Sequence, residues 1–118
     1  MVVIQQIEWI SKEGLEAQVT VTDETYRLLC FSHPFHGECG VEVVQPLFAF
    51  QVDPLYKSYE ENAVEKLAGS FSYRISAVVV DKEKKIVKLG SIYIEIDSPS
   101  LEIFLKETSL FLTVRDLI

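Results

Sequence analysis

Residues 15–22, LEAQVTVT, alternate without interruption between apolar and polar side chains. The apolar parity consists of Leu15, Ala17, Val19 and Val21. Successive side chains of a β-strand point to opposite faces of a sheet, and valine and threonine favour this conformation. The stretch therefore predicts a strand with one buried face, and it is the clearest sign of the fold class.

Six further stretches have strand-like patterns, and short polar turns separate most of them. They are residues 2–10, 26–32, 41–52, 70–81, 86–97 and 109–118. Residues 60–67 precede Gly69 and predict the only short helix. An open sheet of this size would expose unpaired edges, and closure removes them. We therefore expect an all-β fold: a small coiled antiparallel β-barrel of six or seven strands with one short helix at about 60–67, in a single domain over residues 1–118.

The length and composition are those of one globular domain. The chain has 118 residues, of which 48% are hydrophobic and 25% charged, so it can build a core without disulfides or metals. No apolar run approaches the ~18 residues of a membrane span. The first ten residues, MVVIQQIEWI, lack the basic start of a secretory signal and are interpreted as a strand. We expect a cytoplasmic protein with reduced cysteines and no membrane contact.

The net charge is −7, and the excess acid is confined to residues 1–69, because residues 70–118 carry seven basic and seven acidic side chains. Phosphate backbones bind basic surfaces, so nucleic acid is an unfavourable partner. The acidity has two explanations. One is solubility, and the other is a surface that docks a basic protein partner.

Residues 30–40, CFSHPFHGECG, contain the densest set of potential metal ligands. Cys30, His33, His36 and Cys39 follow one another at intervals of three residues. Two thiolates and two imidazoles suit tetrahedral zinc. Structural zinc sites usually separate two ligand pairs by a longer span, whereas here a single loop would have to surround the ion.

A simpler interpretation of the same stretch is a hairpin loop. Cys30 shares its parity with Tyr26 and Leu28, which predicts a buried thiol. The histidines then lie in a polar turn that leads to the next strand. A Cys30–Cys39 disulfide is the third alternative, for an exported protein.

A second candidate site lies in the acidic segment after Asp53. Tyr56 and Tyr59 stand beside Glu60 and Glu61. Tyrosine is enriched at protein interfaces, so these four residues predict a partner-binding surface. The alternative is a solvated connection between two halves of the barrel.

Three stretches resemble small bacterial proteins of unassigned function. They are YRLLCFSHPF (26–35), FSYRISAVVVD (71–81) and SIYIEID (91–97). The order of long coiled strands around one short helix is also similar to the oligonucleotide/oligosaccharide-binding barrels. The resemblance implies a fold and brings no catalytic motif.

The sequence contains no glycine-rich phosphate loop, no HExxH motif and no GxSxG motif. We therefore predict no catalytic residue and no cofactor, apart from zinc at Cys30–Cys39. The function expected is a non-enzymatic protein-binding or adaptor barrel, for example an immunity-type protein that masks a basic partner. The alternative is a ligand- or zinc-binding barrel that uses the Cys30–Cys39 loop. The oligomeric state is left open.

Overall fold

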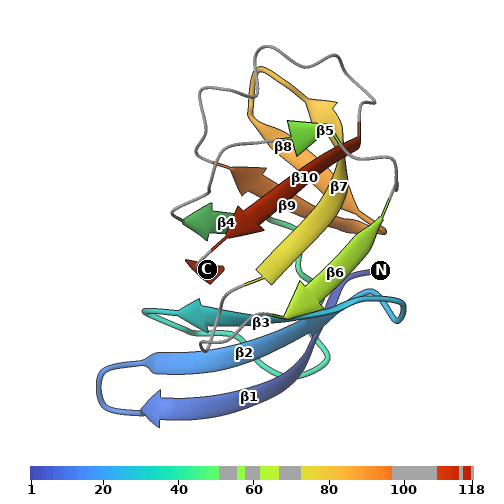
Figure 1. Cartoon of the computed structure of the whole chain (residues 1–118). Coiled ribbons are helices and arrows are strands. Elements are labelled where there is room, and N and C mark those ends of the chain that lie inside the picture. Colours follow the sequence, from blue (N-terminus) through green and yellow to red (C-terminus); the bar gives the residue numbers. More distant parts are fainter. Residues whose placement is uncertain (51–55, 58–61, 67–72, 97–108, 115, 118) are drawn as a thin grey trace.

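A computed structural model describes residues 1–50, 56–57, 62–66, 73–96, 109–114 and 116–117 (Figure 1). Every regular element in these residues is a strand, so the all-β prediction is confirmed. No helix in this part of the chain is long and apolar enough to cross a membrane. The strands form two sheets, and Figure 1 shows the three-stranded sheet lying beneath the larger, curled one.

The first sheet contains β1 (Val3–Ser11), β2 (Glu16–Thr22) and β3 (Arg27–Ser32). The second sheet contains β4 (Leu47–Phe50), β5 (Tyr56–Lys57), β6 (Ala63–Lys66), β7 (Tyr73–Asp81), β8 (Ile86–Leu89), β9 (Ile92–Ile96), β10 (Ser109–Val114) and β11 (Asp116–Leu117).

The strand predicted at residues 15–22 is confirmed as β2, the centre of the first sheet. Leu15 is the exception, because it lies in the preceding turn with a φ of 56°. Val19 lies opposite Ile7 of β1 and Cys30 of β3, so three apolar side chains share one face. The alternating parity of the sequence thus produces the buried face of the sheet.

The second sheet runs in the order β11-β4-β9-β8-β7-β10-β5, and β6 also pairs with β7. It curls as part of a barrel, and a fully closed barrel is not seen among the described residues. The expectation of a purely antiparallel fold is wrong at one place, since β4 pairs with β9 in parallel. The two strands are far apart in the chain, so no short hairpin turn forces them to run antiparallel.

The short helix expected at residues 60–67 is not found. Its described part, residues 62–66, contains β6 instead, and the remainder lies outside the described residues. In β6, Val64 lies opposite Ile75 of β7 and packs against the core. Pairing with a long strand and burial of a β-branched side chain outweigh a weak local helix preference.

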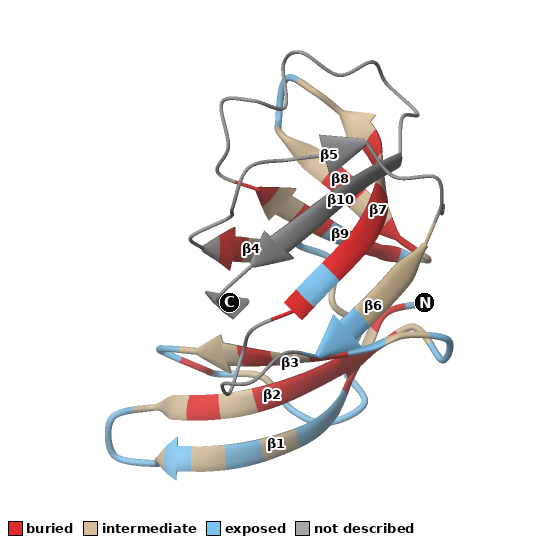
Figure 2. Ribbon diagram, in the orientation of Figure 1, coloured by how far each residue is buried: buried red, intermediate tan, exposed pale blue. Residues whose placement is uncertain are grey.

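One hydrophobic core joins the two sheets. Figure 2 shows buried residues on β2, β7 and β9, and residues of all three strands belong to this core. Among the described residues, the largest fully buried side chains are Leu28, Ile75, Leu89, Ile92, Ile94, Ile96, Val79 and Val87. One of these comes from the first sheet and seven come from the second, so the larger sheet provides most of this inner layer.

Candidate binding cleft at the junction of the two sheets

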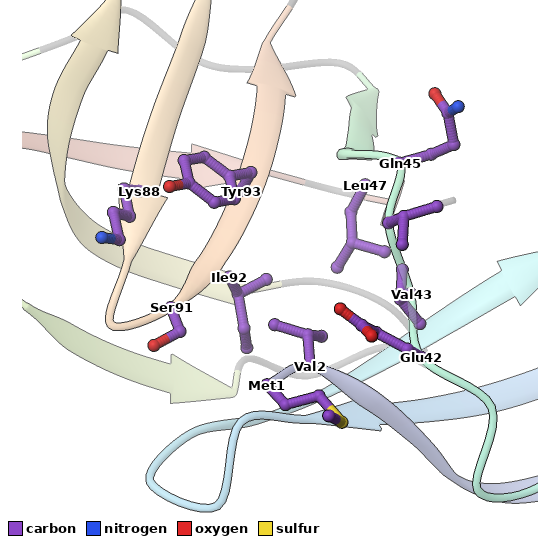
Figure 3. Close-up of a pocket in the computed structure, with 11 residues that line it drawn as sticks. Met1, Val2, Glu42, Val43, Gln45, Leu47, Lys88, Ser91, Ile92 and Tyr93 are labelled. Atoms are coloured by element: carbon purple, nitrogen blue, oxygen red, sulfur yellow. The ribbon is translucent and has the colours of Figure 1, made fainter.

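A cleft of about 380 Å³ opens where the chain passes from the first sheet to the second (Figure 3). We call it the junction cleft. Its lining residues are Met1, Val2, Glu42, Val43, Val44, Gln45, Leu47, Lys88, Ser91, Ile92 and Tyr93. The volume falls within the range of natural ligand sites.

One wall of the cleft is the linker, residues 41–46, whose first part extends the first sheet. The Ile4 N–H donates to the Val41 carbonyl at 3.0 Å, and the Val43 N–H donates to the Val2 carbonyl at 2.7 Å. The last of these bonds is made by Val43, and Pro46, just before β4, has no N–H for a sheet ladder. The linker is bonded to the first sheet, and the chain pairs with β9 only from Leu47 onward. The space between the linker and β9 forms the cleft.

The opposite wall is the β8–β9 hairpin, which pairs with β4 only from Leu47 and Ile94 onward. Figure 3 shows Lys88, Ser91 and Tyr93 on this hairpin, with the Tyr93 ring directed toward Lys88, and the linker residues on the other side of the view. Because the ladder with β4 begins only at Ile94, Ser91 and Tyr93 line the cleft.

The cleft has a buried apolar floor and an exposed apolar rim. Val2, Leu47 and Ile92 are buried beneath it. On the rim, Val44 is 79% exposed and Tyr93 is 46% exposed. Exposed apolar side chains that cluster beside a cavity mark binding surfaces, whereas single scattered ones are ordinary.

The exposed apolar residues of the described chain concentrate at this place. Five large apolar side chains are exposed in that part of the chain: Met1, Ile10, Val41, Val44 and Tyr93. Three of them line the cleft, and Val41 precedes the lining residue Glu42. Only Ile10 lies elsewhere, in β1, which makes it a natural control position.

The two walls carry opposite charges. Glu42 and Gln45 belong to the linker, and Lys88 belongs to the hairpin. Lys88 lies opposite Tyr93 in the hairpin register, and its Nζ is 5.5 Å from the centroid of the Tyr93 ring. A cation at this distance interacts favourably with the ring face, which helps to hold both side chains at the rim.

The Asp23 carboxylate fixes the hairpin wall to the first sheet. Its Oδ1 accepts hydrogen bonds from the N–H groups of Thr25 at 3.0 Å and Tyr26 at 2.7 Å. Its Oδ2 accepts one from the Ser91 N–H at 2.7 Å. One side chain thus joins the β2–β3 turn to the β8–β9 turn, and it places Ser91 at the edge of the cleft.

Two further features hold the same turn. The Gly90 N–H donates to the Asn62 Oδ1 at 2.9 Å. Gly90 has a φ of 60°, and a Cβ atom there would lie 2.5 Å from the Asp23 Oδ2 and 2.7 Å from a Tyr26 ring carbon. Glycine is required at this position both by the left-handed backbone and by the close approach.

The pKa of Asp23 reflects this arrangement. Partial burial acts to raise it, but the hydrogen bonds from the N–H groups of Tyr26, Ser91 and Thr25 outweigh burial and lower it below the ordinary value. Backbone donors favour the charged carboxylate, so the ionised form is the one that joins the two turns.

The structure does not bring together the four residues of the zinc hypothesis. Cys30 is buried in β3, where burial raises its pKa to about 12. His33, His36 and Cys39 are exposed. Both cysteines are free thiols, and the described residues contain no group of three or more His, Cys, Asp or Glu side chains placed to hold a metal. The inward parity of Cys30, which the sequence predicts, points its thiol into the core.

The hairpin interpretation of the same stretch is wrong in its pairing. Among the residues that the structure describes, β3 pairs with β2 only, and β4 pairs with β9 and β11. Residues 33–40, which we call the anchoring loop, instead bond back to the first sheet. The Phe35 N–H donates to the Leu15 carbonyl at 2.9 Å, and the Gly40 N–H donates to the Ile4 carbonyl at 2.8 Å. The loop is bonded to both β1 and the β1–β2 turn, so it cannot close a hairpin with β4.

The predicted partner-binding surface lies largely outside the described residues. Tyr56 is in β5, opposite Phe111 of β10. Tyr59, Glu60 and Glu61 fall outside the described residues, so this surface stays a prediction.

A smaller groove of about 260 Å³ lies between β3 and β6, lined by Arg27, Leu29, Val64, Lys66 and Tyr73. The Leu29 N–H donates to the Tyr73 hydroxyl oxygen at 2.8 Å, which ties the two sheets together. The pKa of Tyr73 is raised, mainly by burial. The groove is thus centred on a structural contact between the sheets.

The sequence alone does not indicate the residues of the junction cleft. Tyr93 and Lys88 have outward parity in residues 86–97, which is an available signal, but many surface positions have the same parity. The pattern of residues 41–52 predicts one continuous strand, and no local feature indicates that its first part bonds to the first sheet and its second part to the second. Comparison with known protein families, with curated proteins and with solved structures gave no match.

Proposed function

We propose that the chain is a non-enzymatic binding module that docks a protein partner at the junction cleft. The observation that carries this proposal is the concentration of exposed apolar side chains on the cleft rim, namely Met1, Val44 and Tyr93. Interfaces place apolar and aromatic residues at the centre of the contact and polar groups around it. Glu42, Gln45, Lys88 and Ser91 provide the polar groups.

The charge of the chain favours a basic partner. The net charge is −7, and Glu42 places a carboxylate on the cleft wall. Opposite charge on a partner accelerates encounter and disfavours acidic competitors. An immunity-type protein that masks a basic partner is one concrete form of this function.

The proposal includes the setting of the module. Both cysteines are free thiols, which supports a reducing compartment, and we place the protein in the cytoplasm. We also propose that the two sheets are the halves of one small coiled barrel, with the junction cleft at the seam between them.

The test is capture of a partner by wild-type protein and by matched variants. Val44→Asp puts a charge on the cleft rim, and Ile10→Asp puts the same charge on an exposed apolar site in β1. Proteins bound at low salt are identified by mass spectrometry, and the partner is then purified for calorimetry. We expect Val44→Asp to weaken the affinity for the partner by at least about tenfold. The apolar cleft rim would form the centre of the interface, and central contacts dominate binding.

Ile10→Asp should change the affinity by less than about twofold, since Ile10 lies in β1 and does not line the cleft. Raising the salt concentration should weaken capture if the partner is basic. Equal loss in the two variants, or an affinity that neither variant changes, would contradict docking at the cleft. So would a small molecule that copurifies with the protein and occupies the cleft instead of a protein.

A further inference from the structure

The edge of β9 that faces the junction cleft is open at its start. The β4–β9 ladder begins at Leu47 and Ile94. On the other edge of β9, the Ile96 N–H donates to the Lys85 carbonyl at 2.9 Å. Main-chain groups alternate in direction along a strand, so the N–H of Tyr93 points to the edge that faces β4 and the cleft. Tyr93 precedes the first rung of the ladder, and its N–H is therefore a main-chain donor at the cleft wall.

The side chains around this donor define what can approach it. The floor beneath it is apolar and comes from Val2, Leu47 and Ile92. Glu42 lies on the linker wall and Lys88 on the hairpin wall, on opposite sides of the floor (Figure 3). A complementary ligand presents a cation to one wall, an anion to the other and an apolar group between them.

An extended polypeptide fits all of these features. Peptides bind sheet edges by adding a strand, in which main-chain hydrogen bonds give affinity and alternate side chains give specificity. The Tyr93 N–H provides the first bond, and the apolar floor receives the side chain that faces inward. The β4–β9 ladder begins at Leu47 and Ile94, next to this donor, so the space admits a few residues rather than a long strand.

We propose that the junction cleft takes a short extended peptide segment that adds to the β9 edge at Tyr93. The segment carries an apolar residue for the floor, a basic residue against Glu42 and an acidic residue against Lys88. This inference rests on the proposed function and names the form of the partner segment.

The experiment is amide-resolved NMR of the full chain with defined peptides. The probe is an N-acetylated, C-amidated pentapeptide with the composition basic–valine–leucine–valine–acidic, and a second probe carries the two charges in the reverse order. Each is added up to about 1 mM, which detects affinities in the millimolar range. We expect one order to bind better, and we expect the hydrogen exchange of the Tyr93 amide to slow at least about tenfold in that complex.

Two controls distinguish strand addition from nonspecific binding of the peptide. A probe with a methylated main-chain nitrogen at each valine keeps the side chains but cannot complete the main-chain pairing, and it should bind at least about tenfold more weakly. The double variant Glu42→Lys/Lys88→Glu exchanges the charges of the walls, and it should reverse the preferred order of the probe.

The inference is overturned if neither probe binds at 1 mM, if the methylated probe binds equally well, or if the Tyr93 amide gains no protection. These results leave the proposed function standing as long as the captured partner still loses affinity with Val44→Asp. The proposed function falls separately, if the partner binds Val44→Asp and Ile10→Asp as tightly as the wild type.

Discussion

Two consecutive segments lead from β3 to β4, and they differ in how far their apolar side chains are buried. The anchoring loop (33–40) buries Phe35, whose ring centroid lies 5.8 Å from that of Trp9. The linker (41–46) follows directly and leaves Val44 79% exposed at the junction cleft. Burial of an apolar side chain stabilises the fold, whereas exposure adds nothing to it. The comparison separates a residue that serves folding from one that is available for binding.

The largest effect is expected in the anchoring loop. Phe35→Ala removes a buried aromatic side chain that packs against Trp9, and it should lower the free energy of unfolding by about 3 kcal/mol. Urea denaturation followed by the fluorescence of Trp9 measures this change. Val44→Ala is the control in the linker. A loss from Phe35→Ala no greater than that from Val44→Ala would remove the contrast between the two segments.

The next largest effect is expected at the turn that forms the hairpin wall. Gly90→Ala combines a left-handed backbone with a Cβ atom 2.5 Å from the Asp23 Oδ2, and it should cost about 2 kcal/mol. Gly40→Ala is the matched control, because Gly40 has a φ of 85° but no atom within 4 Å of its Cβ position. The control should cost about 1 kcal/mol. Thermal unfolding of both variants compares the two, and equal losses would show that the close approach to Asp23 is unimportant.

A smaller effect is expected at Asp23, and it depends on pH. The folded state lowers the pKa of this carboxyl, so its stabilisation is complete above the unfolded pKa of about 3.9 and is lost as the pH falls through the folded pKa. Asp23→Asn should cost about 1 kcal/mol at pH 7, because a neutral amide oxygen accepts backbone hydrogen bonds less strongly. Denaturation at pH 7 and at pH 3 should show the difference between wild type and variant shrinking at the lower pH. A constant difference would contradict the role of the ionised carboxylate.

The smallest effect on stability is expected on the cleft rim. Val44→Asp replaces a side chain that is 79% exposed, so the free energy of unfolding should change by less than about 0.5 kcal/mol. Denaturation under the conditions used for Phe35→Ala measures it. A large loss of stability would mean that Val44 supports the fold, and the loss of binding in that variant would no longer identify the cleft.

The strands could be predicted from the sequence where side-chain parity is strict. The alternation in residues 15–22 determines β2, and the inward parity of Cys30 predicts the burial that keeps its thiol away from His33 and His36. The alternation of side chains indicates which face of a strand is buried, but it does not indicate which strands pair with it in the sheet. For this reason the pairing of β4 with β9, and the strand at residues 63–66, did not follow from local pattern.

The junction cleft could not be predicted for a related reason. It arises because one stretch, residues 41–50, pairs first with β1 and then with β9, and both partners are distant in sequence. Val44 becomes a rim residue only through this change of partner. Likewise, the sequence around Asp23 indicates an ordinary turn residue. Its hydrogen bond with Ser91 depends on how the second sheet packs, which the local sequence does not show.

The central claim is that the apolar rim of the junction cleft is a docking surface, and the affinity of the purified partner for Val44→Asp and for Ile10→Asp tests it most directly. Both variants place the same new charge on an exposed apolar position, and only one of these positions lines the cleft. We predict that Val44→Asp weakens binding by at least about tenfold and that Ile10→Asp changes it by less than about twofold. Equal affinities, or a greater loss from Ile10→Asp, would contradict the claim.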